Sequence, residues 1–117
     1  MIIVAFTTKT SKIIPRICCG KWKHVAPIVI RGDVMTMYQF IKHGDIQPIK
    51  LIARDLSILG QYGWEFIYLN QNPVAKINPR DEYTCVQFTK RLIGIYDWRI
   101  QTPGALYRML TRHNQSE

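Results

Sequence analysis

Residues 22–41 read WKHVAPIVIRGDVMTMYQFI and contain two apolar runs on either side of Gly32-Asp33. Both halves are rich in β-branched and aromatic residues, which favours strands. The pair Gly32-Asp33 between them suits a two-residue hairpin turn, because glycine tolerates the positive φ that the first turn position requires. We therefore predict two antiparallel strands, residues 22–30 and 34–41, joined by a tight turn.

This hairpin brings a histidine beside an amide. With the turn at residues 32–33, Ala26 lies opposite Gln39, and alternation along the strands puts His24 on the same face. The Gln39 amide oxygen is then placed to accept a hydrogen bond from the imidazole and to fix its tautomer. A solvent-facing Gln39 and a half-exposed strand His24 are the simpler alternatives. Pro27 lacks an N–H donor, so we expect its strand to lie at a sheet edge or to contain a bulge.

Residues 83–95, YTCVQFTKRLIGI, predict an amphipathic helix with a cysteine in its first turn. Apolar residues recur at helical spacing, whereas Lys90 and Arg91 are expected to face water. The partial positive charge at a helix N-terminus favours a thiolate, which makes Cys85 a candidate reactive thiol. The more common role of a cysteine is as a buried core side chain, and that alternative stays open.

The remaining patterns predict a small α+β domain. We expect strands at residues 2–6, 64–70 and 74–77, and helices at residues 51–59 and 102–113, the last capped by Thr102. This order of elements favours a single domain, residues 1–117, in which a small antiparallel sheet packs against helices. The basic segment 7–23 is expected to be flexible.

The chain carries a net charge of +8 and has a sequence pI of about 9.7. Cations are concentrated before His24, where no acidic residue accompanies them. Such a charge favours an acidic protein or a nucleic acid as partner. No apolar run is long enough to span a bilayer. The first residues lack the basic leader and cleavage site of a signal peptide, so we expect cytoplasmic synthesis.

The three cysteines do not form a disulfide or metal pattern. Cys18 and Cys19 are adjacent, and neighbouring cysteines bridge poorly, so we expect reduced thiols. The spacing of cysteines and histidines does not match a zinc site, and we expect neither a metal nor another cofactor. Cys18 and Cys19 are also poor partners for His24, because pairing across so few residues requires a sharp chain reversal.

Three segments resemble one superfamily. Residues 22–29, WKHVAPIV, look like the histidine-bearing strand of the circularly permuted papain-like proteins, and residues 83–88, YTCVQF, are similar to their cysteine-bearing helix start. That superfamily includes the NlpC-type cell-wall peptidases and the lecithin:retinol acyltransferase-like enzymes. In its permuted members the histidine strand precedes the cysteine helix, as it does here. Residues 102–108, TPGALYR, resemble the tail of small bacteriophage-encoded members.

The resemblance implies a permuted papain-like fold and a catalytic pair, Cys85 and His24, with Gln39 as the third residue. Such enzymes hydrolyse or transfer acyl groups through a thioester. The expected function is that of a phage-encoded cysteine amidase, peptidase or acyltransferase with an acyl or peptide substrate, located in the host cytoplasm or the virion. Two alternatives stay open. One is a catalytically silent basic structural or interaction protein, such as a virion component or a host-directed inhibitor, and the other is a nucleic-acid-binding module.

Overall fold

The structure is a computed structural model that describes residues 1–8, 24–40, 46–74 and 85–115. Its elements, in chain order, are β1 (Ile2–Thr7), β2 (His24–Arg31), β3 (Val34–Phe40), β4 (Ile46–Leu51), α2 (Ala53–Gln61), β5 (Glu65–Leu69), α3 (Cys85–Ile93) and α4 (Pro103–Gln115). The strands form one antiparallel sheet in the order β4-β3-β2-β1-β5. The prediction of an α+β fold with an antiparallel sheet is therefore confirmed.

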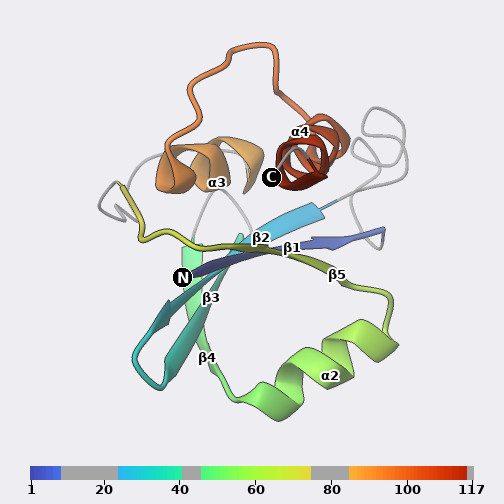
Figure 1. Ribbon diagram of the computed structural model, residues 1–117. Coiled ribbons are helices and arrows are strands. Elements are labelled where there is room, and N and C mark those ends of the chain that lie inside the picture. The colour runs from blue at the N-terminus through green and yellow to red at the C-terminus, as the bar shows by residue number, and fades with distance from the viewer. Residues whose placement is uncertain (9–23, 41–45, 75–84, 116–117) are drawn as a thin grey trace.

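Helices cover both faces of the sheet. Figure 1 shows α3 and α4 on one side and α2 on the other. The strand β1 lies between these layers, and all six of its residues are buried, which explains why its sequence is a continuous apolar run. Its even-numbered residues pack toward α3 and α4, and Ile3 and Ala5 pack on the α2 side. The chain thus builds two apolar layers around one central strand.

The hairpin β2–β3 has the predicted turn and register. Gly32 adopts a φ of 58° at the turn, and Ile30 pairs with Met35. The expectation that Pro27 would place β2 at a sheet edge is wrong, because β2 is the middle strand of the five. The Ile30 N–H donates to the oxygen of Met1, the residue before β1, at 2.9 Å, so by alternation the missing donor of Pro27 faces β3. The register with β3 ends at the neighbouring pair Ile28–Met37, and the β1–β2 ladder is intact.

The ends of the other elements follow local chemistry. The helix α2 begins at Ala53 rather than at residue 51, because Leu51 ends β4. The strand β5 falls inside the predicted range 64–70, with Ile67 and Leu69 directed into the core. The Thr102 hydroxyl accepts a hydrogen bond from the Ala105 N–H at 3.1 Å and caps α4 as predicted.

Two further predictions concern segments that are described only in part. Thr7 is buried and belongs to β1, whereas residues 9–23 lie outside the described residues, so the flexibility expected for segment 7–23 stays a prediction. Of the predicted strand 74–77 only Val74 is described, and it lies in a bend. No helix in the described part of the chain is long and apolar enough to cross a membrane.

Candidate functional site

Cys85 lies in the first turn of α3, as the sequence predicted; the helix runs over Cys85–Ile93, and residues 83–84 of the predicted range lie outside the described residues. Its side chain is a half-buried thiol that packs against the core between the sheet and the helices α3 and α4. The main-chain oxygen of Cys85 accepts a hydrogen bond from the Thr89 hydroxyl at 2.8 Å, one turn further along the helix. The thiol therefore lies at the end of a helix where backbone N–H groups favour negative charge.

His24 is the first residue of β2, and it contacts Gln39 on β3. The imidazole Nε2 lies 3.2 Å from the Gln39 Oε1, which confirms the contact predicted from the hairpin register. The other amide atom, Gln39 Nε2, donates to the Met37 sulfur at 3.5 Å and so fixes the orientation of the amide. An amide oxygen only accepts hydrogen bonds, so the imidazole Nε2 is the protonated nitrogen of this pair. In the neutral ring the basic lone pair is then on Nδ1.

Trp64 is a neighbour of His24 that sequence reasoning did not single out. The two rings meet edge to face, with centroids 6.2 Å apart and an interplanar angle of 82°. Trp64 directly precedes β5, and β5 and β2 both pair with β1, so the residues become neighbours only through the strand order. A strand pattern in the sequence cannot give that order. The indole is half-buried, and its ring lies edge to face with the imidazole.

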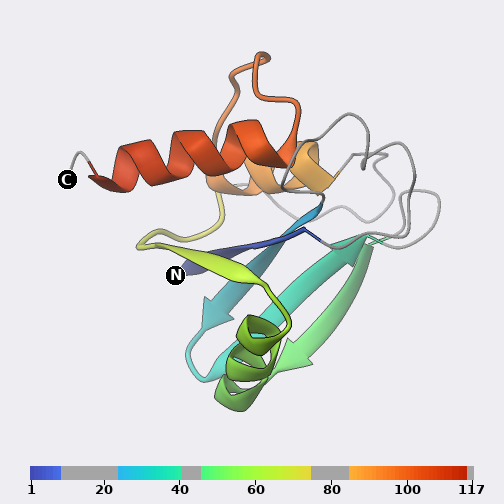
Figure 2. The same ribbon diagram turned by 90° about the vertical axis from the view of Figure 1, so that its right-hand side faces the viewer.

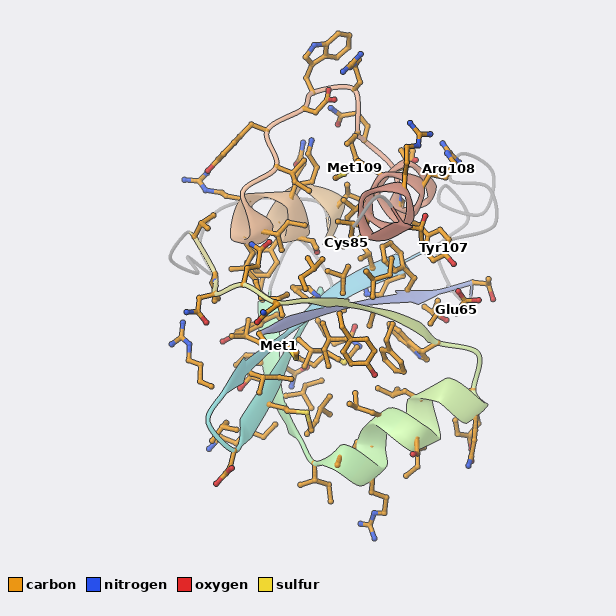
Figure 3. All side chains as sticks on the ribbon, in the orientation of Figure 1. Met1, Glu65, Cys85, Tyr107, Arg108 and Met109 are labelled. Atoms are coloured by element: carbon orange, nitrogen blue, oxygen red, sulfur yellow. The ribbon has the colours of Figure 1, made fainter. Side chains whose placement is uncertain are left out.

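Cys85 and His24 lie at the same end of the sheet but contact different layers. The helix α3 packs on β2, and Figures 1 and 2 both place the start of α3 beside the start of β2. Figure 3 labels Cys85 at that end of the helix. The described contacts of His24, with Gln39 and Trp64, belong to the α2 side of the sheet, whereas Cys85 packs on the α3 side. The structure thus brings His24 and Gln39 together, and the pairing of Cys85 with His24 stays a prediction.

Lys90 in α3 corrects another expectation. The sequence pattern placed it in water with Arg91, yet only 7% of Lys90 is exposed. Its ammonium donates to the main-chain oxygens of Asp97 and Ile100 at 2.7 and 2.8 Å. Burial of a charged group is tolerated when its donors are satisfied, and these carbonyls belong to the loop that follows the helix. The periodicity of α3 alone contains no information about that loop.

No family model, curated protein or solved structure matches the chain. The likeness to the permuted papain-like proteins therefore stays a prediction carried by residues 22–29 and 83–88. Within the described ranges, no three His, Cys, Asp or Glu side chains form a group that could hold a metal ion. The candidate site thus consists of a thiol at a helix start and an oriented imidazole at a strand start.

Proposed function

We propose that this protein is a small phage-encoded cysteine hydrolase or acyltransferase of the permuted papain-like type. In this proposal Cys85 is the nucleophile, His24 its base and Gln39 the residue that orients the base. The observation that supports it most directly is the hydrogen bond between His24 Nε2 and Gln39 Oε1. That bond holds the imidazole in the tautomer that a thiol requires of its base, at the end of the sheet where α3 begins.

The chemistry follows from this tautomer. The Cys85 thiol gives its proton to His24 Nδ1, and the thiolate attacks the carbonyl carbon of an amide or ester. The resulting imidazolium protonates the leaving amine or alcohol, and the acyl group stays on sulfur as a thioester. Water or another acceptor then attacks the thioester, giving its proton to His24 and restoring the thiol. Backbone N–H groups in the first turn of α3 are suited to stabilise the oxyanion in both steps.

Catalysis by this pair requires a short distance between the His24 imidazole and the Cys85 sulfur. A base must come within hydrogen-bond reach of its nucleophile, either directly or through one water molecule. His24 is the first residue of its strand, so its ring has to approach the Cys85 sulfur around the end of β2 rather than through the sheet. The Trp64 contact lies on the α2 side of the sheet, so this approach starts from the face opposite to Cys85.

The rate of thiol alkylation tests the pair without knowledge of the substrate. We expect iodoacetamide to modify Cys85 between pH 6 and 7 roughly tenfold faster than Cys18 and Cys19, because a base and a helix start favour the reactive thiolate. Mass spectrometry of the digested protein resolves the three sites. The variant His24→Ala should remove the advantage of Cys85.

A second histidine provides the control. His113→Ala removes an imidazole from α4 and should leave the alkylation rate of Cys85 unchanged, with thermal unfolding measured for both variants to establish that each is folded. If Cys85 reacts no faster than Cys18 and Cys19, or if His24→Ala leaves its rate unaltered, the cysteine-enzyme function is wrong. The catalytically silent interaction protein would then be the better description.

A further inference from the structure

The loop between α3 and α4, residues 94–102, projects from the molecule and is held in place by internal contacts. Figures 1 and 2 show it rising from the helical layer on the side away from the sheet. The buried Lys90 ammonium holds it from below through the carbonyls of Asp97 and Ile100. The Ile100 side chain anchors its far end in the core, and the Ile100 N–H donates to the Asp97 oxygen at 3.2 Å. The loop is therefore supported by several internal contacts along its length.

This loop presents two aromatic side chains to solvent. Tyr96 and Trp98 are each 77% exposed, the highest exposure among the large hydrophobic residues that the structure describes. Asp97, which lies between the two aromatic residues in the sequence, forms a bidentate ion pair with Arg99. The Arg99 Nη2 and Nε atoms lie 2.9 and 3.0 Å from the carboxylate oxygens. The Gln101 amide donates to the Trp98 carbonyl and so fixes the backbone at the indole. A supported loop that exposes two large rings is typical of a binding surface.

The surface around the loop is positively charged. Between residues 85 and 115 the sequence contains one acidic residue, Asp97, and Arg99 neutralises it. Arg91 on α3 and Arg108 and Arg112 on α4 are exposed. Figure 3 shows Arg108 on the outer side of α4, away from the sheet. Arg112 follows four residues later and therefore lies on the same face of the helix.

We propose that residues 94–102 and the outer face of α4 bind single-stranded nucleic acid. Exposed aromatic rings beside a basic surface are the combination that binds single strands, because every base offers a face for stacking and the backbone is anionic. Bases stack on Trp98 and Tyr96, and Arg108 and Arg112 contact the phosphates. A duplex hides the faces of its bases and cannot use these rings. The ion pair beside Trp98 disfavours insertion of the loop into a lipid bilayer, where charged groups are costly.

Fluorescence anisotropy with a short labelled oligothymidylate, which does not fold on itself, tests this inference on the full chain. We expect binding at low salt that weakens steeply as salt is added. Trp98→Ala should weaken binding roughly 5- to 150-fold, the effect of losing one stacked base. The matched control is Tyr62→Ala, which removes another exposed ring, 62% accessible, at the end of α2. It should leave the affinity unchanged.

The charge contribution is tested by a pair of double variants. Arg108→Gln with Arg112→Gln should reduce the slope of log affinity against log salt by about 1.4, because each phosphate contact to a single strand contributes about 0.7. Lys50→Gln with Arg54→Gln makes the same change of charge on exposed residues near α2 and should leave the slope nearly unaltered. The two single variants and the two double variants all change exposed side chains, and their unfolding temperatures establish that they are folded.

Three outcomes would overturn the inference. They are no binding at low salt, equal losses for Trp98→Ala and Tyr62→Ala, and tighter binding to duplex or to phosphatidylglycerol vesicles than to the single strand. The alkylation rate of Cys85 is measured on the same Trp98→Ala protein. Because Trp98 lies on a separate surface, we expect that rate to be unaltered, so the binding and the catalytic proposals succeed or fail independently.

Discussion

The Lys90 ammonium donates a hydrogen bond to the Ile100 carbonyl at 2.8 Å inside the protein. With the second bond, to Asp97, this contact joins α3 to the loop that precedes α4. A cation buried in this way is a structural element of the loop and is not available to a ligand. Its removal should therefore affect stability as well as the shape of the projection.

Lys90→Met tests this structural role. Methionine retains most of the apolar stem but leaves two carbonyls without their charged donor, so we expect a loss of roughly 1.5–3 kcal/mol in the free energy of unfolding. Urea denaturation measures it. Arg108→Met, an exposed change on α4, should stay within about 0.5 kcal/mol of the parent protein. Similar values for the two variants would mean that the buried ammonium does not hold the loop.

The ion pair in the loop predicts a low titration midpoint for Asp97. The side-chain hydrogen bonds from Arg99, helped by a backbone bond from its N–H, lower the pKa of Asp97 from 3.8 to about 2. Because the folded-state pKa is depressed, the interaction is fully present above pH 3.8 and is lost as the pH falls through 2. NMR titration of the carboxyl carbon measures the midpoint. Arg99→Gln should return it toward 3.8.

The contact between Tyr107 on α4 and Glu65 on β5 can be separated into two parts. The Tyr107 hydroxyl donates to Glu65 Oε2 at 2.8 Å, and its ring meets Phe6 edge to face at 5.2 Å. Tyr107→Phe removes only the hydrogen bond and should cost about 0.5–1.5 kcal/mol, whereas Tyr107→Ala also removes buried ring surface and should cost roughly 3–5 kcal/mol. Equal losses in urea denaturation would contradict this division.

The same contact has a pH dependence. The hydrogen bond to Glu65 raises the pKa of Tyr107 above 10.0, with burial as a smaller cause. Its stabilisation is therefore fully present below pH 10.0 and is lost as the pH rises through the folded-state value. Ultraviolet titration of tyrosinate should show one tyrosine that ionises later than the others. Glu65→Gln should move it back toward the ordinary range.

Two glycines should respond to alanine with opposite signs. Gly94, at the end of α3, has a φ of 83°, and an added Cβ would lie 3.1 Å from Val74 Cγ2. Gly94→Ala should therefore cost about 1–3 kcal/mol. Gly60 lies inside α2, where the nearest atom to an added Cβ is 4.0 Å away, on Phe66. Gly60→Ala should stabilise the protein by up to about 1 kcal/mol, because alanine favours the helix. Thermal and urea unfolding measure both, and a stabilising Gly94→Ala would contradict the strain.

Gln39→Ala tests whether the amide positions the imidazole. We expect the alkylation rate of Cys85 to fall roughly tenfold, the equivalent of about one hydrogen bond, and nitrogen NMR to report a mixed tautomer for His24. Gln47 pairs with Gln39 across the β3–β4 ladder and is exposed, so Gln47→Ala is the matched control. A changed rate with an unchanged tautomer would mean that Gln39 acts through stability and not through positioning.

The parts of the structure that the sequence predicted are those that depend on nearby residues. The turn at Gly32-Asp33 sets the register of the hairpin, and the register in turn gives the contact between His24 and Gln39. The start of α4 at Pro103 follows from capping by Thr102, which is the residue directly before it.

The parts that were missed depend on residues far apart in the chain. The central position of β2, which made the expectation for Pro27 wrong, follows from pairing with β1 across a long connection. The Trp64–His24 contact requires that same strand order. The burial of Lys90 requires carbonyls that a loop supplies after the helix ends. None of these contacts leaves a periodic signal in the sequence.

Because the β2–β3 ladder ends at Pro27, the His24–Gln39 hydrogen bond also has a structural role between the two strands. Among the described residues, the backbone register between the two strands ends at Ile28–Met37, and the His24–Gln39 side-chain bond joins the strands beyond that pair. The imidazole Nε2 donates to the amide oxygen whether the ring is neutral or protonated, because the proton that comes and goes is on Nδ1. The side-chain hydrogen bond that joins β2 to β3 here therefore does not depend on the charge of the histidine. The ring can exchange protons at Nδ1 while this bond between the strands stays in place.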